Sequence, residues 1–227
     1  MKKVIIITGG SDGLGKKITK KLAPQNDVII VSDNKEKLEI TASEIGCDFQ
    51  VCDVTKYPEI AQAVKSVISK YGKIDCLVNN AGVWIEGELD ENSEQEIEEV
   101  LKINTLGTIN FAKAVIPQMK TQKEGRIINI ISQAGFYAKA KRSIYSASKF
   151  ALRGFTKALE DELVEYGIGV MGIYPGKMNT QLFEKAGIHK KMEDAIKTEE
   201  VAKVIEFILS FDSNVVFPEI GIKNING

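Results

Sequence analysis

Short apolar runs alternate along the chain with longer segments in which apolar residues recur every three or four positions. The runs are rich in valine and isoleucine, which is typical of strands that a parallel sheet buries on both faces. The first run ends at Thr8-Gly9 and the sixth at Pro175-Gly176, residues that interrupt regular structure. We therefore predict seven strands, at 4–7, 28–31, 49–52, 74–78, 126–131, 169–174 and 215–222.

The segments between these strands carry the spacing of amphipathic helices, each with one apolar stripe. In the first segment Leu14, Ile18 and Leu22 recur every four residues. We expect helices at 14–22, 38–45, 60–71, 93–117, 146–166 and 198–209.

The expected helix ends have residues suited to them. Gly46 and Gly72 follow two of the stripes, and glycine readily takes the left-handed conformation that closes a helix. Asn92 or Ser93 would be the N-cap of the longest helix, whose first turns contain acids that the helix dipole favours. The apolar pattern of this helix runs on to about Pro117.

The alternation of buried strands and helices predicts an α/β fold. Parallel strands need crossover connections, and right-handed crossovers place helices on both faces of the sheet. We expect a single domain over residues 1–227, doubly wound around a seven-stranded parallel sheet. Residues 181–197, between the sixth strand and the last helix, form the one irregular stretch.

Composition excludes several classes of function. Of the 227 residues, 44% are hydrophobic and 27% are charged, as in a folded globular protein. Lysine and arginine number 30 against 31 acids, so no basic field attracts nucleic acid or an anionic membrane. Three cysteines and one histidine are too few for a disulfide framework or a zinc site, and we expect no metal. The apolar run at 4–7 is too short for a signal peptide or membrane helix, so we expect a cytoplasmic protein.

The segment at 8–15, with the sequence TGGSDGLG, joins the first strand to the first helix. Positions without side chains let a pyrophosphate approach the backbone, and the helix N-terminus offers unpaired N–H groups and a positive dipole end. The spacing is not G-x-G-x-x-G, and a plain tight turn explains the glycines equally well. As a dinucleotide turn, the segment would contribute these contacts: Gly9, Ser11, Asp12, Gly13, Leu14 and Gly15.

Two acids follow predicted strands at the same edge of the sheet. Asp33 comes after the second strand, about 20 residues past the glycines, where a carboxylate can accept hydrogen bonds from ribose hydroxyls. Asp53 comes after the third strand and could face the adenine. Each acid could instead be the N-cap of the helix that follows it.

Three polar residues could carry acid–base chemistry. Ser132 follows the fifth strand, and Tyr145 and Lys149 are four residues apart, hence neighbours on one helix face. A free tyrosine has a pKa near 10, and a fixed ammonium beside it would lower that pKa. A Y-x-x-x-K spacing also arises by chance on a solvated helix face. It indicates a function here because the pair is expected at the carboxyl edge of the sheet.

Together these motifs make the chain resemble the short-chain dehydrogenase/reductase family over essentially its whole length. The likeness is greatest to the small-substrate branch with hydroxy-acid and serine dehydrogenases and 3-oxoacyl reductases. The resemblance implies a Rossmann fold and a nicotinamide cofactor, NAD(P)(H). Besides the glycine turn and Asp33, it implies these cofactor contacts: Asp53, Val54, Asn80, Ala81, Gly82, Tyr145, Lys149, Pro175, Gly176, Met178 and Thr180.

The resemblance also implies a catalytic tetrad. Tyr145 would exchange a proton with the substrate oxygen, and Ser132 would orient that oxygen by a hydrogen bond. Lys149 would bind the nicotinamide ribose and lower the pKa of Tyr145, and Asn104 would hold a water of a proton relay. The implied reaction moves a hydride between the cofactor and a small alcohol or carbonyl compound, such as a hydroxy or keto acid or a 3-oxoacyl group.

Two other classes of function were weighed against this enzyme. A non-catalytic, dinucleotide-sensing protein on the same fold would not need Ser132, Tyr145 and Lys149. A methyltransferase would not need the Tyr–Lys pair, and a nucleotide-sugar epimerase would usually need a longer region after Thr180. The intact tetrad therefore favours the oxidoreductase.

Charges near the expected adenosine site favour NAD(H) over NADP(H). Asp33 stands where NADP-dependent relatives often carry arginine, and a carboxylate repels a 2′-phosphate. Asp12 adds a second negative charge. Lysines at 16, 17 and 35 could partly compensate.

The substrate pocket should contain Gln133 and Ala134 beside the catalytic residues and Gly176. The resemblance also implies that residues 181–197 form a short substrate lid. Possible apolar walls are Phe183, Phe136 and Trp84; ordinary packing is the alternative for each of them and is favoured for Trp84. Basic residues around the lid would favour an acidic substrate, unless they are solvated surface lysines; they are Lys139, Lys141, Arg142, Lys177, Lys185, His189, Lys190 and Lys191.

The resemblance further implies a homodimer or homotetramer. In the family, the helices that begin near Asn92 and Ser146 lie at a subunit interface. The second helix has apolar residues on more than one side, so one face can pack on the sheet while another meets a second subunit; these residues are Phe150, Leu152, Phe155 and Leu159.

Overall fold

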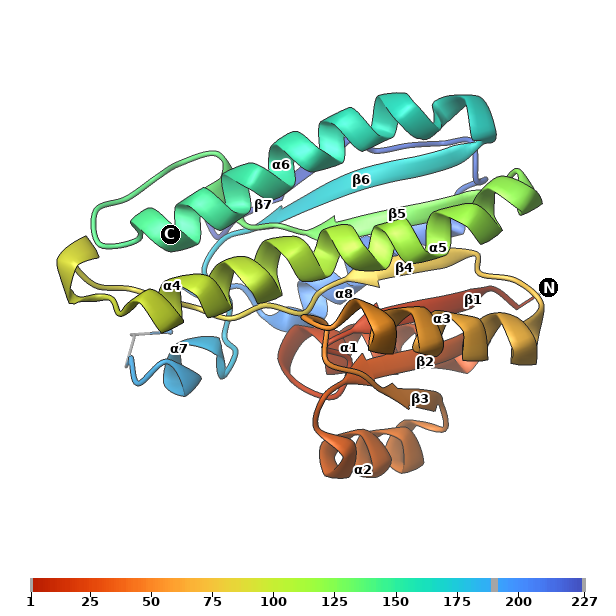
Figure 1. Ribbon diagram of the computed structural model, residues 1–227, viewed down its shortest axis with the longest axis horizontal. Helices are drawn as coiled ribbons and strands as arrows, with labels where there is room; N and C mark the ends of the chain where they lie inside the picture. The colour runs from red at the N-terminus through yellow and green to blue at the C-terminus, as the bar shows by residue number, and fades with distance from the viewer. Residues whose placement is uncertain (1, 189–191, 226–227) are drawn as a thin grey trace.

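Seven parallel strands form a single sheet in the order β3-β2-β1-β4-β5-β6-β7 (Figure 1). The structure is a computed structural model that describes residues 2–188 and 192–225. The strands are β1 (Val4–Thr8), β2 (Asp27–Ser32), β3 (Asp48–Val51), β4 (Cys76–Asn79), β5 (Gly125–Ile130), β6 (Ile168–Pro175) and β7 (Glu219–Ile222). The doubly wound, single-domain α/β fold predicted from the sequence is confirmed.

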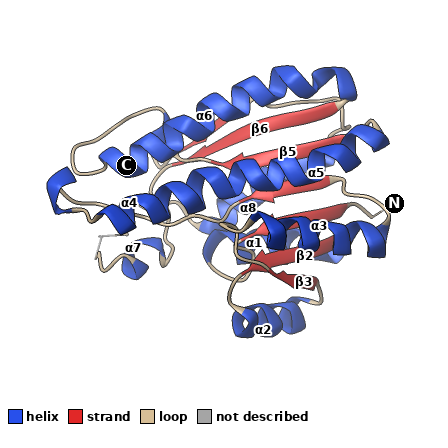
Figure 2. Cartoon of the chain, viewed as in Figure 1, coloured by secondary structure: helices blue, strands red, loops and turns tan. Residues whose placement is uncertain are grey.

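Helices cover both faces of the sheet, as Figure 2 shows in front of and behind the strands. The helices are α1 (Gly13–Leu22), α2 (Lys35–Ile45), α3 (Tyr57–Tyr71), α4 (Glu94–Leu101), α5 (Thr108–Gln122), α6 (Ser143–Leu163), α7 (Leu182–Lys185) and α8 (Thr198–Ser210). Helices α1, α2 and α8 pack on one face, and α3, α5 and α6 pack on the other.

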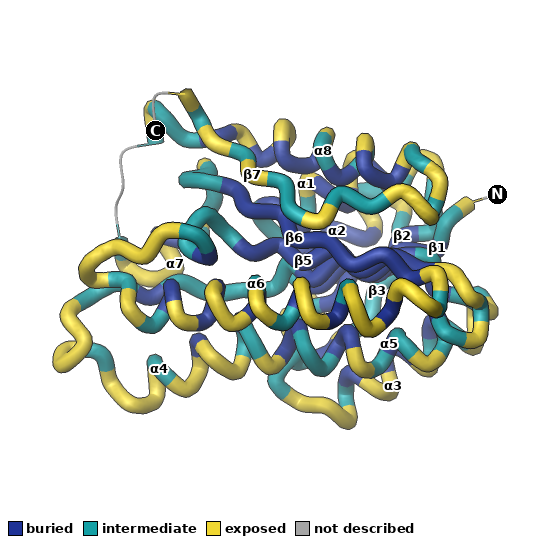
Figure 3. The backbone as a smooth tube through the Cα atoms, turned by 90° about the horizontal axis from the view of Figure 1, so that it is seen from above, coloured by how far each residue is buried: buried dark blue, intermediate teal, exposed yellow. Residues whose placement is uncertain are grey.

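The core consists of two layers, because successive strand residues point to opposite faces of a sheet. In β1, Ile5 and Ile7 pack against α1 and α8, whereas Val4 and Ile6 pack against α3 and α5. Figure 3 shows the central strands buried from end to end between the two helix layers. Burial on both faces explains why these strands read as unbroken apolar runs.

The predicted helix ends are confirmed where a cap residue marks them. Gly46 and Gly72 follow α2 and α3 with φ of 76° and 74°, in the left-handed region. Ser93 is the N-cap of α4, and its hydroxyl accepts a hydrogen bond from the backbone N–H of Glu96. The Glu96 carboxylate accepts from the N–H of Ser93 in return, which completes a capping box.

The long helix expected from 93 to about 117 differs from the prediction. It is divided into α4, a π-helical turn (Lys102–Gly107) and α5, and α5 continues past Pro117 to Gln122. Proline removes one helical hydrogen bond, but the apolar stripe of α5 includes Met119, which is buried in the core. Core packing therefore outweighs the local signal to stop.

Other boundaries also differ from the prediction by a few residues. The helix expected at 146–166 begins at Ser143 and ends at Leu163, followed by one 3₁₀ turn. The last strand is Glu219–Ile222 rather than 215–222. The carbonyl of Val215 binds Arg126 instead of a strand, and Pro218 has no N–H to donate to a ladder.

The order of the strands reverses between β1 and β4. At such a point the connections from neighbouring strands leave toward opposite faces and open a crevice at the carboxyl ends. Helices α4 and α7 lie beyond this edge of the sheet (Figure 1). Among the described residues, no helix is both long enough and apolar enough to cross a membrane.

Buried Arg126, in β5, closes the C-terminal end of α8. Its guanidinium donates hydrogen bonds to the carbonyl oxygens of Ile208 (2.6 Å), Phe211 (3.0 Å) and Asp212. The last carbonyls of a helix have no partner within the helix, so these bonds satisfy groups that would otherwise be orphaned. The positive charge also opposes the negative end of the helix dipole.

We predict that Arg126→Met lowers the free energy of unfolding by about 3 kcal/mol, because it leaves several buried carbonyls without donors. Chemical denaturation followed by circular dichroism measures the change. Lys20→Met, an exposed lysine of α1, is the control and should change stability by about 0.5 kcal/mol or less. Equal effects of the two substitutions would contradict the assigned role of Arg126.

Candidate active site

One cleft of about 1270 Å³ follows the carboxyl edge of the sheet. It extends from Ser32 and Asp33 after β2, past the turn between β1 and α1, to Ser132 and Tyr145. Sixteen of the predicted catalytic and cofactor-binding residues line it: Gly9, Ser11, Asp12, Gly13, Leu14, Asp33, Asn80, Ala81, Gly82, Ser132, Tyr145, Lys149, Pro175, Gly176, Met178 and Thr180.

The glycine turn leads the chain from β1 into the N-terminus of α1. Asp12 is the N-cap, and its side chain accepts a hydrogen bond from the Gly13 N–H at 2.7 Å. Gly13 has φ of 48°, a conformation that L side chains rarely adopt. Gly15 does not line the cleft, and a Cβ there would lie 2.1 Å from the Gly9 carbonyl oxygen. Its lack of a side chain allows the turn to pack closely.

The Asp12 carboxylate is shared by two lysines from distant parts of the chain. Lys37 of α2 and Lys185 of α7 approach its Oδ2 atom at 3.3 and 2.8 Å. Partial burial alone would raise the pKa of Asp12, but the hydrogen bonds from Lys185 and Gly13 hold this pKa below its usual value. The negative charge counted at Asp12 in the sequence is therefore compensated in the fold.

The end of the cleft beside β2 carries Asp33. Asn34, not Asp33, is the N-cap of α2 and accepts from the Lys37 N–H at 2.9 Å. Asp33 accepts a hydrogen bond from the Ser32 hydroxyl at 3.2 Å. Within residues 2–188 and 192–225, no cation forms an ion pair with its carboxylate. Lys37 lines this part of the cleft, whereas Lys16, Lys17 and Lys35 do not.

Besides Gly15, the predicted cofactor contacts Asp53 and Val54 lie outside the lining of the cleft. The Asp53 carboxylate accepts hydrogen bonds from the N–H and hydroxyl of Thr55 at 2.9 and 2.7 Å and pairs with Lys56. Val54 packs against Gly107 of the π-helical turn. The N-cap residue of α3 is Lys56, so Asp53 is not the N-cap of the helix that follows it.

The segment after β4 is bound to the end of β1. The Thr8 hydroxyl accepts from the backbone N–H groups of Asn80 and Ala81 at 2.9 and 3.0 Å. The Asn80 amide donates to the Thr8 carbonyl at 3.0 Å. These bonds hold the small residues Ala81 and Gly82 in the wall of the cleft, where they leave room for a ligand.

Fully buried Asn104 lies in the π-helical turn, a kind of turn frequent at functional sites. Its Oδ1 accepts from the Val83 N–H at 2.8 Å, and its Nδ2 donates to the Val83 carbonyl at 3.0 Å. The same amide donates to the Ser148 hydroxyl of α6 at 3.2 Å. Asn104 thereby joins the segment after β4 to α6.

Ser132 and Tyr145 meet at the inner end of the cleft. Ser132 lies two residues after the end of β5, and its backbone φ is 151°. Its hydroxyl accepts a hydrogen bond from the Ala134 N–H at 3.1 Å. Tyr145 is buried, and burial raises its pKa to about 12, although a hydrogen bond with Ser132 and the nearby charge of Arg142 oppose the increase. The pair can therefore hold a proton beside a bound oxygen atom.

Lys149 lies one helical turn after Tyr145, and its Nζ is 5.6 Å from the centre of the Tyr145 ring. Burial lowers the pKa of Lys149 to about 8. In the protein alone, desolvation of the deeply buried Tyr145 phenol outweighs the opposing effects of Ser132 and Arg142 on its pKa. That Lys149 depresses this pKa stays a prediction.

Aromatic side chains form the substrate side of the cleft. The Trp84 ring lies 4.2 Å from the Tyr145 ring and 4.8 Å from the Phe183 ring between centroids. Phe136 is not part of this wall, because it packs on Tyr174 with a centroid distance of 4.2 Å. For Trp84 the sequence analysis favoured ordinary packing, whereas the structure places this residue in the lining of the cleft.

Several of the basic residues around the lid have acidic partners. Lys177 is bound to Asp194, and Arg142 approaches Glu86 at 3.4 Å. Lys141 pairs with Glu88 at 3.1 Å outside the lining of the cleft. Lys139 and Lys223 also line the cleft. The remaining predicted basic residues, His189, Lys190 and Lys191, lie outside the described residues.

The residues present fit a dinucleotide. The cleft is continuous from the acid after β2 to Tyr145, the N-terminus of α1 faces its middle, and Gly13 leaves the backbone bare there. Gly176 lies on the far wall, where its N–H is held by the Ile222 carbonyl at 2.7 Å. Among the described residues, no group of three His, Cys, Asp or Glu side chains could hold a metal ion.

Comparison with known proteins places the fold and the site in one family. Residues 3–191 match the family model described as short chain dehydrogenase. The 3-oxoacyl-(acyl-carrier-protein) reductase FabG of Thermotoga maritima is 35% identical over 94% of this chain and 93% of its own.

Solved structures agree. The closed form of serine dehydrogenase complexed with NADP+ is 26% identical with a TM-score of 0.92, covering 99% of this chain and 96% of its own. An actinorhodin polyketide ketoreductase with NADPH is 28% identical with a TM-score of 0.89, covering 98% and 96%. The chain therefore belongs to the short-chain dehydrogenase/reductase family and is an NAD(P)-dependent oxidoreductase.

Proposed function

We propose that the protein interconverts a small secondary alcohol and the corresponding carbonyl compound, with Tyr145 as the acid–base catalyst. The observation that carries this proposal is that the buried Tyr145 phenol and Ser132 both line the inner end of the cleft. A substrate oxygen that binds both hydroxyls would be oriented by Ser132 and would lie within proton-transfer reach of Tyr145. A bound nicotinamide ring supplies or accepts the hydride.

The protonation state of Tyr145 bears on the direction of the reaction. Carbonyl reduction needs the neutral phenol as proton donor, and alcohol oxidation needs the phenolate as acceptor. Because burial raises the pKa of Tyr145 to about 12, the phenol is protonated below that pH in the protein alone. The site without a further positive charge is therefore suited to donate a proton, and oxidation should gain rate as the pH rises.

Lys149 and Asn104 have supporting roles in this proposal. Lys149 would hold the nicotinamide ribose by hydrogen bonds from its amino group. Its Nζ already lies at the wall of the cleft, where a Cβ on Gly82 would be only 3.8 Å away. Asn104 would keep this wall in place through its bonds to Val83, and a water bound near it would complete a proton path to solvent.

We propose NAD(H) as the preferred cofactor, on the charge of Asp33. The related structures with NADP+ and NADPH do not support this preference, so it rests on the local charges alone. Asp12 is compensated by Lys37 and Lys185, which leaves Asp33 as the group that would repel a 2′-phosphate. Lys37 is the cation that would attract one.

For the substrate we propose a small, uncharged compound rather than an acid. A hydroxy or keto acid, or a 3-oxoacyl group on an acidic carrier, would need free positive charge at the cleft. Lys177, Lys185 and Arg142 each have an acidic partner, which lowers the positive charge that such a substrate would find, although Lys139 and Lys223 also line the cleft. We also propose that residues 181–197 are the lid, because Phe183 and Leu182 line the cleft. A cytoplasmic location is part of the proposal, in keeping with three free cysteines.

A non-catalytic dinucleotide sensor is the alternative reading of the same cleft. It gives no reason for a serine and a buried tyrosine to line the inner end of the cleft together. We therefore favour the enzyme, and turnover decides between the two.

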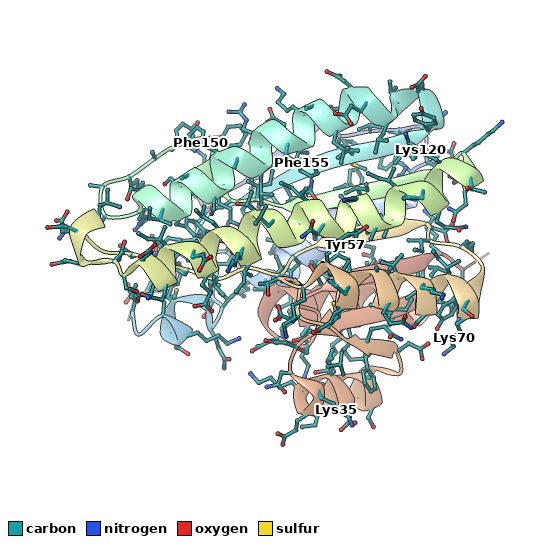
Figure 4. The ribbon with its side chains drawn as sticks, viewed as in Figure 1. Lys35, Tyr57, Lys70, Lys120, Phe150 and Phe155 are labelled. Carbon is teal, nitrogen blue, oxygen red and sulfur yellow. The ribbon has the colours of Figure 1, made fainter. Side chains whose placement is uncertain are left out.

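We further propose a homodimer or homotetramer. On α6, Leu152 and Leu159 are buried in the core, but Phe150 is 42% exposed and lies on the outer side of the helix (Figure 4). Leu106, in the π-helical turn, is 50% exposed. Apolar side chains left in water on neighbouring elements favour contact with a second subunit.

Tyr145→Phe is expected to lower kcat by at least about a hundredfold, because it removes only the oxygen that transfers the proton. Stopped-flow and steady-state absorbance at the NADH wavelength measure turnover, and isothermal titration should find the dinucleotide affinity unchanged within about threefold. Tyr57→Phe, which removes a hydroxyl from a tyrosine of α3 outside the cleft (Figure 4), is the matched control. A variant at position 145 with near-native turnover would exclude Tyr145 from this role.

Asp33→Asn should strengthen NADPH binding relative to NADH by about tenfold, since it removes a negative charge next to the expected 2′-phosphate. Lys37→Gln should change the ratio in the opposite direction by removing a positive charge. Dissociation constants of both cofactors, measured by titration calorimetry for all three proteins, test the assignment. Tighter binding of NADPH than of NADH by the unsubstituted protein would overturn the proposed preference.

Light scattering at micromolar concentration should find a particle of two or four subunits rather than one of 25.0 kDa. Phe150→Glu should shift this particle toward the monomer, because the interface would have to bury a charge. Val164→Glu, at an exposed apolar residue beyond the end of α6, is the control and should leave the mass unchanged. A monomeric unsubstituted protein would refute the proposed assembly.

A further inference from the structure

Trp84 is the only tryptophan of the chain, and it lies directly beside the proposed acid–base catalyst. Its ring is tilted by 48° against the Tyr145 ring at 4.2 Å and meets Phe183 edge-on at 4.8 Å. Tyr145 and Phe183 are buried, and Trp84 is half-buried at the wall of the cleft. A group attached to a carbonyl carbon at Tyr145 therefore has aromatic surface next to it.

The orientation of Trp84 is determined by polar contacts on its other sides. Its indole N–H donates to the Glu86 carboxylate at 3.2 Å. The Arg142 guanidinium lies over the indole, 5.2 Å from its centroid, and approaches the same carboxylate at 3.4 Å. Cation–π attraction and the hydrogen bond act together to keep the ring in one position. Asn104 fixes the backbone immediately before it, at Val83.

The surroundings of this ring are apolar and electrically balanced. Val100 and Ile85 lie in the same small hydrophobic cluster as Tyr145, with Trp84 packed against it. Among the described residues, the cation that lies over the indole is Arg142, and it already has Glu86 as its anionic partner. A carboxylate on the substrate would have to compete with Glu86, whereas an uncharged ring needs no countercharge and can pack on the aromatic side chains.

We propose that Trp84 is a specificity-determining residue that selects uncharged carbonyl compounds and alcohols with an aryl substituent. The aryl ring would pack against Trp84 and Phe183 where the two residues line the cleft, in offset or edge-on contact, while the carbonyl oxygen binds Ser132 and Tyr145. This inference rests on the proposed oxidoreductase function and names its substrate class. Small alkyl substituents would fit the same space, but they would leave much of the two aromatic surfaces without contact.

The ratio of kcat/KM for acetophenone to that for 2-butanone, each with NADH, tests the proposal. We expect the ratio to fall at least about tenfold in Trp84→Ala and by less than about threefold in Trp84→Phe, which keeps an aromatic ring. Phe207→Ala, at an exposed ring of α8 far from the cleft lining, should leave the ratio unchanged. An equal loss for both ketones in Trp84→Ala would mean that the residue is only structural and would overturn the proposal.

Binding can also be measured without turnover, because all the tryptophan fluorescence of the protein comes from Trp84. Benzamide, an uncharged aryl carbonyl compound that the enzyme is not expected to reduce, should change the emission of the protein with saturation. Acetamide and benzoate should bind at least about tenfold more weakly, because the first lacks the ring and the second carries a charge. Phe183→Ala should weaken benzamide binding while keeping the tryptophan signal.

The two experiments separate this inference from the proposed function. If the protein reduces 2-butanone but neither prefers acetophenone nor binds benzamide, the oxidoreductase stands and the role of Trp84 is refuted. If benzamide binds and no carbonyl compound is reduced with either cofactor, the aryl site stands and the proposed reaction fails. Benzoate binding tighter than benzamide would overturn the selection of uncharged substrates.

Discussion

The amide of Asn104 binds both backbone groups of Val83, and the substrate side of the cleft depends on this pair of bonds. After β4 the chain leaves the sheet, so its backbone N–H and C=O groups no longer have a neighbouring strand as partner. The amide side chain takes the place of that strand. Its Oδ1 accepts from the Val83 N–H at 2.8 Å, and its Nδ2 donates to the Val83 carbonyl at 3.0 Å. Because the π-helical turn aims Asn104 inward and Ser148 of α6 binds the same amide, three elements become one rigid unit. Trp84 and Tyr145 are brought to each other by this unit.

Burial acts on the two titratable residues of the site in opposite directions. It raises the pKa of Tyr145 to about 12 and lowers that of Lys149 to about 8, because it disfavours the charged form of each. In the protein alone, therefore, the Tyr145 phenol stays protonated at mildly alkaline pH, whereas the Lys149 amine loses its proton there. A positive charge delivered into the cleft would act at low dielectric and would favour the phenolate strongly. The desolvated site makes the acidity of Tyr145 responsive to what is bound there.

Periodicity in the sequence predicted every strand and the helices that cover the sheet, since each of them buries an apolar face in the core. It failed where a distant side chain or the core decides an element's end, as at Pro117 and at Val215, whose carbonyl binds Arg126. The order of Ser132, Tyr145 and Lys149 along the chain was enough to predict that they meet. Trp84 could not be predicted in the same way, because its position depends on Glu86 and on Arg142, 58 positions later in the chain.

The net charge along this cleft depends on which acidic and basic side chains form ion pairs, and not only on which residues are present. In the sequence, Asp12 is a negative charge near the cofactor and Lys185 a positive charge near the substrate. In the fold they neutralise each other at 2.8 Å, although 173 positions separate them. Lys37 reaches the same carboxylate from α2, so one acid joins the adenosine side of the cleft to α7. Any displacement of α7 that breaks the Lys185 contact leaves Asp12 with Lys37 alone, and the potential at the cofactor end then changes with it. The electrostatic potential where the cofactor would bind therefore depends on the position of α7 over the substrate side.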